Sequence, residues 1–286
     1  MQFHLYLPQM RLSPEQLVER ARAAEAAGFE GIAGMDHLAP PMAERLPMFE
    51  AMTTNTWLAA RTSTLVVGSL VLCDTFRHPA VLARQAVTLD HLSGGRFELG
   101  LGWGSVVGEI ETFGIGSGAA ADRVARLEET LEVIKALWTG EAVDYDGEHH
   151  QLRGAQQMPT PSRPIPIVIG GVGRKTMKLV AEHAHWWNLN TTVLDRLDEM
   201  RQHAGDARVS IQQVIAFVPS EDLRADVTEM AQRRFGVMNP VVGDAAELAD
   251  HFGRLEDRGV ERVYAWFTDF ASPDTIAAFG ESQIDL

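Results

Sequence analysis

Apolar and polar positions repeat with two different periods along the chain. Short, almost wholly apolar runs predict buried parallel strands, and longer stretches with apolar residues three or four positions apart predict amphipathic helices. The predicted strands cover residues 2–8, 29–35, 64–72, 96–101, 167–169, 186–189, 209–218 and 262–267. The predicted helices cover residues 13–27, 49–61, 79–93, 122–139, 174–183, 222–235 and 244–258, with one more ending near His203 and a last one beginning at Pro273.

Strand and helix alternate about eight times, and no break suggests a second domain. This order predicts an α/β fold of the parallel (β/α)8 type, a TIM barrel that covers residues 1–286 as a single domain. Residues 140–163, after the fourth predicted helix, contain no convincing core element, so we expect a surface insertion there. Residues 106–121 form a long connection without a predicted element.

Polar, aromatic or glycine residues follow nearly every predicted strand. They are Gln9, Asp36, His37, Cys73, Asp74, Trp103, 170–173, Asn188, Asn190, Thr268 and Asp269. In a barrel of this type the active site lies at the carboxyl ends of the strands, where these residues would meet. The clustering predicts a site for a small molecule at that end.

Asp36-His37 is the pair in this set that can move a proton near neutral pH, because an ordinary histidine titrates there. A capping aspartate beside a packed histidine would give the same sequence. The exit Gly100-Leu101-Gly102-Trp103-Gly104 has almost no side chains except one large aromatic, which suits the backbone's close approach to a flat ligand. An ordinary tight turn is the alternative.

Gly170-Gly171-Val172-Gly173-Arg174 is the strongest ligand signal that the residues themselves give. Glycines free the backbone amides, a predicted helix starts directly after them, and its dipole favours an anion such as a phosphate. Arg174 and Lys175 add positive charge in an acidic chain. A glycine-rich hinge remains the alternative.

Charge and cysteine content narrow the function classes. The formal net charge of −14 argues against nucleic acid or an anionic membrane as the main partner. The single cysteine, Cys73, excludes an internal disulfide and a cysteine zinc cluster and fits a reducing compartment. No signal segment or long apolar run is present, so we expect a cytoplasmic protein. No set of histidines and carboxylates has metal-ligand spacing, and Gly-x-Ser-x-Gly is absent, so neither a metal site nor a serine hydrolase is predicted.

Several motifs, in their order along the chain, carry a family resemblance. They are Gly28-Phe29, Met35-Asp36-His37-Leu38, Phe76-Arg77-His78-Pro79-Ala80, Leu89-Asp90-His91-Leu92-Ser93-Gly94-Gly95-Arg96-Phe97, Gly100-Leu101-Gly102, Arg126-Leu127-Glu128-Glu129, Ala136-Leu137-Trp138-Thr139-Gly140 and Ile169-Gly170-Gly171. Over about residues 1–190 the chain resembles the luciferase-like flavin and deazaflavin oxidoreductases. It resembles most their coenzyme F420 branch, where Met-Asp-His and a cysteine near the third strand exit are common.

The resemblance implies a (β/α)8 barrel that holds an isoalloxazine-type ring across strands two to four. Asp36 and His37 would lie beside the ring as the catalytic groups. The cofactor-binding residues implied in this way, together with those of the glycine turn, are Leu70 and Val71 at a non-proline cis peptide, Cys73, Gly102, Trp103, Gly104, Gly170, Gly171, Val172, Gly173 and Arg174. No metal ion is implied.

The chain departs from the family pattern at three places. Tryptophan stands at 103, two positions from its usual place, and Ala184-His185-Trp186-Trp187 replaces Ala-Asp-Gly-Trp. Members that act on sugar phosphates carry an acidic residue near Ser105, so the serine argues against that substrate class.

The expectation is therefore an oxidoreductase that transfers a hydride between reduced F420 and a small organic substrate. One alternative is an FMN-dependent monooxygenase that uses reduced flavin and oxygen in the same barrel. Another is a (deaza)flavin-binding protein without turnover. The sequence names no substrate, and assembly as a homodimer is left open.

Overall fold

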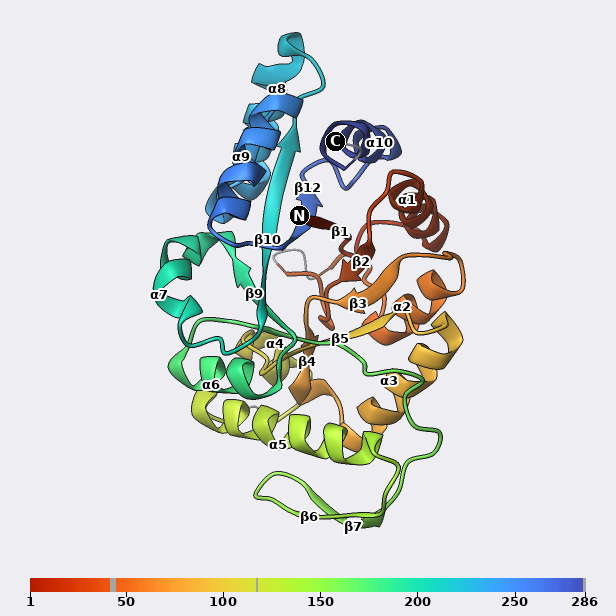
Figure 1. Ribbon diagram of the computed structural model, residues 1–286. Coiled ribbons are helices and arrows are strands. Elements are labelled where there is room, and N and C mark those ends of the chain that lie inside the picture. Colours follow the sequence, from red (N-terminus) through yellow and green to blue (C-terminus); the bar gives the residue numbers. More distant parts are fainter. Residues whose placement is uncertain (42–44, 117, 285–286) are drawn as a thin grey trace.

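Eight parallel strands close into a barrel in the computed structural model, which describes residues 1–41, 45–116 and 118–284 (Figure 1). They are β1 (Gln2–Tyr6), β2 (Gly31–Gly34), β3 (Val66–Ser69), β5 (Phe97–Gly102), β8 (Ile167–Gly170), β9 (Trp186–Asn190), β10 (Arg208–Phe217) and β12 (Arg262–Phe267). Each strand pairs with the next in this order, and β12 pairs back with β1. The (β/α)8 barrel predicted from the sequence is confirmed.

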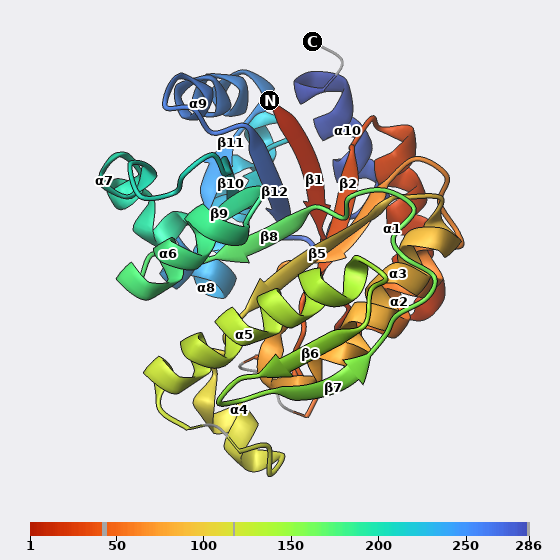
Figure 2. The same ribbon diagram turned by 60° about the horizontal axis from the view of Figure 1, so that its bottom comes forward.

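Helices surround the barrel, as the alternating pattern predicts (Figure 2). They are α1 (Pro14–Ala26), α2 (Ala51–Ala59), α3 (Pro79–Ser93), α5 (Ala120–Trp138), α6 (Arg174–His183), α7 (Leu197–Arg201), α9 (Ala245–Asp257) and α10 (Pro273–Gln283). Local chemistry sets their ends. Ser13 and Gln16 form a capping box at the start of α1, and Gly94, with φ of 67°, ends α3 in the left-handed conformation.

The predicted third strand, 64–72, is interrupted. β3 ends at Ser69, the peptide bond between Leu70 and Val71 is cis, and the short strand β4 (Leu72–Cys73) continues the pairing along β5. The position of this cis peptide is the one that the family resemblance implied.

The insertion 140–163 contains an antiparallel hairpin that the sequence pattern did not predict. Its strands are β6 (Val143–Asp146) and β7 (Gln151–Ala155), and of their residues only Leu152 is buried. The hairpin lies along α5 (Figure 2), where Glu129 accepts the backbone amides of residues 148–150. With a single buried position the hairpin has almost no apolar alternation to detect.

The helix predicted over 222–235 is present as α8 (Arg224–Phe235), after β10. Two further elements lie in segments that the patterns left as connections: α4 (Val107–Thr112) after β5, and β11 (Val241–Gly243), which pairs with the end of β10. Short 3-10 helices cover 74–76, 191–196, 221–223 and 236–238. Of these unpredicted elements, α4 matters for the site.

A buried polar cluster fills the amino-terminal end of the barrel. Glu98 of β5 accepts a hydrogen bond from Arg262 at 2.7 Å and another from the hydroxyl of Tyr264 at 2.8 Å, and all three side chains are buried. The guanidinium of Arg262 also stacks on Trp186, 3.7 Å from the ring centroid. Burial and the neighbouring carboxylate raise the pKa of Tyr264, so its hydroxyl stays a donor. This end of the barrel is therefore a packed floor, and the carboxyl ends of the strands are left for a ligand.

Candidate active site

A cavity of about 390 Å³ opens at the carboxyl ends of the barrel strands. Its lining includes most of the residues singled out in the sequence, namely Asp36, His37, Leu70, Val71, Cys73, Gly102, Trp103, Gly104, Gly170, Gly171 and Val172. Gly173 and Arg174 lie just outside it, at the start of α6. Strand exits far apart in the sequence thus meet at one cavity, as expected for this fold.

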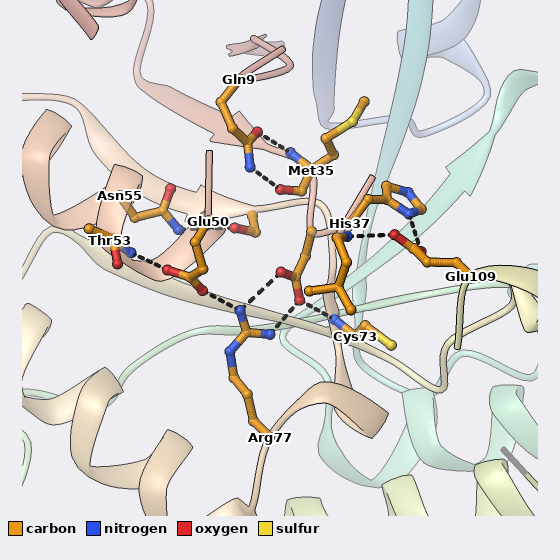
Figure 3. Close-up of polar contacts among 12 residues, drawn as sticks. Gln9, Met35, His37, Glu50, Thr53, Asn55, Cys73, Arg77 and Glu109 are labelled. Carbon is orange, nitrogen blue, oxygen red and sulfur yellow. Dashed lines mark hydrogen bonds and ion pairs between the residues drawn. The ribbon is translucent and has the colours of Figure 1, made fainter. Parts of the chain in front are cut away.

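Asp36 is held on both of its carboxylate oxygens. The guanidinium of Arg77 donates to both oxygens, and the backbone N–H of Cys73 donates to one of them at 2.7 Å. Arg77 also donates to Glu50, whose other oxygen caps α2 through the amide of Thr53 (Figure 3). Asp36 therefore ties the exit of β2 to the loop that follows β3.

His37 is held by a residue that the sequence patterns did not single out. Its Nδ1 lies 2.8 Å from Oε2 of Glu109 on α4, and Oε1 of Glu109 accepts the backbone amides of Leu38 and Ala39 at 2.5 and 3.0 Å (Figure 3). The bond to the carboxylate favours the tautomer with its proton on Nδ1, so the lone pair is on Nε2. His37 lines the cavity with 23% of its side chain exposed, which leaves this ring able to meet a ligand.

Gln9 fixes the backbone just before the Asp36-His37 pair. Its side-chain amide donates to the carbonyl of Met35, and its oxygen accepts the amide of Met35 at 3.1 Å (Figure 3). Gln9 is 2% exposed, so this pair of bonds is shielded from water. These two bonds continue the pairing of β1 with β2 beyond the last strand residues. They fix the position of the backbone from which His37 extends.

The glycines after β5 are required by the protein itself. A Cβ on Gly102 would lie 2.7 Å from a methyl of Val71, and one on Gly104 would lie 2.7 Å from the sulfur of Cys73. Gly104 also has φ of 74°, which disfavours other residues. The sequence suggested that these glycines allow a flat ligand to approach closely. The structure gives a second reason for them: the segment between β3 and β4 packs directly onto β5 and leaves no space for side chains. Burial raises the pKa of the Cys73 thiol to about 11, which keeps it protonated at neutral pH.

The glycine turn after β8 leads into a helix start without a capping side chain. Gly173 precedes α6 with no side-chain cap, and the first turn of α6 contains no acidic residue. The first amides of a helix have no acceptor within it, so this terminus suits an anion. The amide of Gly171 donates to Asn188, and its carbonyl accepts from the indole of Trp187 at 2.8 Å. Gly171 is thus fixed in place, and the open amides are those that follow it.

Amide side chains line the wall of the cavity opposite His37. Asn188 and Asn190 come from β9 and Gln212 from β10, and β9 is four strands from β2 in either direction around the barrel. Asn190 donates to Gln212 at 3.4 Å, and Gln212 hydrogen-bonds Tyr6. This wall offers neutral donors and acceptors.

Among the described residues, no group of three or more histidine, cysteine, aspartate or glutamate side chains could hold a metal ion. The helices of the same ranges include none with the length and apolarity to cross a membrane.

Comparison with known proteins identifies the family of the chain. The model of the luciferase-like monooxygenase family matches residues 1–213. An F420-dependent glucose-6-phosphate dehydrogenase of Mycolicibacterium fortuitum is 39% identical over 165 residues, which are 57% of this chain and 49% of that one. One of Microbacterium testaceum (strain StLB037) is 28% identical over 252 residues, 81% of this chain and 75% of that one. The match thus spans about half the length of the first of these relatives.

Solved structures agree on the architecture. An F420-dependent secondary alcohol dehydrogenase, in complex with an F420-acetone adduct, has a TM-score of 0.83 at 18% identity and covers 98% of this chain and 97% of its own. The monooxygenase RslO1 from Streptomyces bottropensis has a TM-score of 0.82 at 18% identity and covers 100% and 99%. At such identity the likeness shows the fold. The family model covers most of the chain, and the fold agrees with it: this protein belongs to the luciferase-like monooxygenase family.

Proposed function

We propose that the protein is an F420-dependent oxidoreductase that transfers a hydride between the deazaflavin and a small organic substrate. The observation that carries the proposal is one cavity whose lining includes both the His37–Glu109 pair and residues 170–172, the turn that leads into the uncapped start of α6. The names of the curated relatives, F420-dependent dehydrogenases, support it.

The residues present fit such a cofactor. The helix start at Gly173, with the exposed cations Arg174 and Lys175, suits its phosphate, and the Leu70–Val71 and Gly102–Gly104 segments form the cavity surface for its ring. Lys178, a third cation of α6, is already paired with Glu128 at 2.9 Å. When bound, the deazaflavin supplies the hydride chemistry.

The protein's own part is positioning and proton transfer. We propose that His37 takes or gives the substrate proton at Nε2, while Glu109 fixes its tautomer. Asp36, held by Arg77, acts as a positioning residue that shapes the backbone around Cys73.

The direct test is an anaerobic titration of the purified protein with F420 and with FMN, followed by absorbance. We expect F420 to bind at least about tenfold more tightly, because Arg174 and Lys175 can meet the carboxylates of its tail. Micromolar FMN affinity without measurable F420 binding would instead favour the flavin monooxygenase. Tight F420 binding without turnover of any acceptor would favour a cofactor-binding protein.

A matched pair of glycine variants tests the phosphate site. Gly173 has φ of −72° and its nearest Cβ contact would be 3.6 Å away, so valine fits there without strain in the protein. We expect Gly173→Val to weaken the phosphorylated cofactor by about 1.5–3 kcal/mol, since it crowds a charge-assisted hydrogen bond. Binding of the dephosphorylated form and the melting temperature should hardly change.

Gly171→Val is the control, because its φ of 123° disfavours any side chain. This variant should lower the melting temperature whatever the ligand. Equal weakening of both cofactor forms by Gly173→Val would show that the turn shapes the barrel and does not hold a phosphate.

We also propose a homodimer in the cytoplasm. Val81 and Leu92 on α3 are 55% and 67% exposed, and both line a surface groove of about 480 Å³ that a second copy could cover. The free cysteine fits a reducing compartment. Sedimentation of the purified chain as a monomer would contradict the dimer.

A further inference from the structure

The charges around the cavity are unusual for a site that would take a phosphorylated substrate. Among the described residues, its lining includes no lysine and no arginine. The two carboxylates that line it, Asp36 and Glu109, already have their partners: Asp36 binds Arg77 and the Cys73 amide, and Glu109 binds His37 and two backbone amides. An anion that entered would lose its hydration, find no cation and face two carboxylates.

Arginines near this end of the barrel interact with other groups of the protein. Arg77 is bound to Asp36 and Glu50. Arg11 and Arg234 stack on the ring of Phe270, 5.6 and 5.9 Å from its centroid, and neither lines the cavity. Arg123 lies over the ring of Trp103, 5.2 Å from its centroid, and Arg126 binds Asp74 at 2.6 Å; neither arginine lines the cavity. Arg174 stands at the helix start assigned above to the cofactor phosphate.

The cavity offers instead apolar surface and neutral hydrogen-bonding groups. Outside the surface assigned to the cofactor, apolar side chains from the ends of β2, β4, β5 and β9 line the cavity: Met35, Phe76, Val106, Ile110, Leu189 and Val193. The neutral polar groups include Asn188, Asn190 and Gln212, across the barrel from His37, and Tyr6 on β1, the strand next to β2. A ligand that reaches from His37 to this wall crosses apolar surface and ends at amides.

We propose that the substrate is an uncharged, largely apolar alcohol, or the matching carbonyl compound, and not a phosphorylated sugar such as the one in the relatives' names. This rests on the proposed function. In the oxidising direction the carbinol C–H bond breaks and its hydride goes to oxidised F420, while the hydroxyl proton goes to Nε2 of His37 and the C=O bond forms. In the reverse reaction the hydride returns to the carbonyl carbon and the proton returns to the carbonyl oxygen.

The test compares two ligands of one skeleton that differ in charge, methyl 4-hydroxycyclohexanecarboxylate and its free carboxylate, and adds glucose 6-phosphate as the sugar phosphate. Binding is measured through intrinsic tryptophan fluorescence, since Trp103 lines the cavity, and F420 reduction is measured with each compound. We expect the ester to bind at least about tenfold more tightly than either anion. Gln212→Lys should narrow or invert the ratio of ester to carboxylate, and Gln212→Met, which keeps the length without the charge, should preserve it.

Equal or tighter binding of either anion by the wild type overturns the inference, as does failure of the ester to bind. An unchanged ratio in folded Gln212→Lys overturns it too. The proposed function fails separately: loss of F420 binding with the ester still preferred contradicts the cofactor assignment alone, and tight F420 binding with an anion preferred contradicts the substrate class alone.

Discussion

Replacing His37 by alanine is expected to lower kcat about 10²-fold while the affinity for F420 changes little, the usual span for one acid–base group. The ring lines the cavity, and among the described residues its hydrogen bond is to Glu109 on α4, so its loss removes a proton acceptor without opening the barrel. The rate of F420 reduction with the neutral ester, measured from about pH 6 to 9, is the check.

His203→Ala is the matched control, because that histidine is exposed and lies outside the cavity; its rate should equal that of the wild type. Glu109→Gln should keep F420 affinity and lower kcat, since an amide can either donate to Nδ1 or accept from it and so no longer fixes the proton there. A wild-type rate for His37→Ala at every pH would make the histidine structural.

Replacing Glu98 by alanine is expected to cost about 3–5 kcal/mol of the free energy of unfolding, because it leaves a buried guanidinium without its carboxylate. Glu98 and Arg262 are each 6% exposed at the side chain, and the hydroxyl of Tyr264 loses its acceptor in the same change. Urea unfolding at neutral pH, followed by circular dichroism, measures the loss.

Glu261→Ala is the control for that experiment. It removes another glutamate from an arginine, Arg208, but this pair is exposed, 49% and 44% at the two side chains. Such pairs contribute about 0–1 kcal/mol. If Glu98→Ala lowers the free energy of unfolding no more than Glu261→Ala does, the buried cluster does not stabilise the amino-terminal end of the barrel.

The sequence patterns predicted the barrel and the residues at its strand ends because both depend on local order. Buried parallel strands are short apolar runs, and every exit faces the same end, so Asp36, Trp103 and Gly170 could be brought together without a structure. The cis peptide at Leu70–Val71 was expected from the family resemblance. The residues from 64 to 72 form a continuous apolar run, in which no pattern indicates that the strand is interrupted.

The partner of His37 could not be predicted in this way. Glu109 is 72 positions away in sequence, on a helix of six residues whose pattern is too short to read. Sequence patterns also could not show why glycine is required at positions 102 and 104. Their side-chain space is taken by Val71 and Cys73, a contact between strands that only the fold shows.

The bonds of Glu109 bear on how far the loops of this barrel can be exchanged. One carboxylate on the connection after β5 holds the ring of His37 and two amides of the loop after β2. A chimaera that takes the β5 connection from another family member, to alter specificity, also removes the support of His37, the residue proposed to transfer the proton. In this protein the two loops form one transplantable unit, and recombination should move them together.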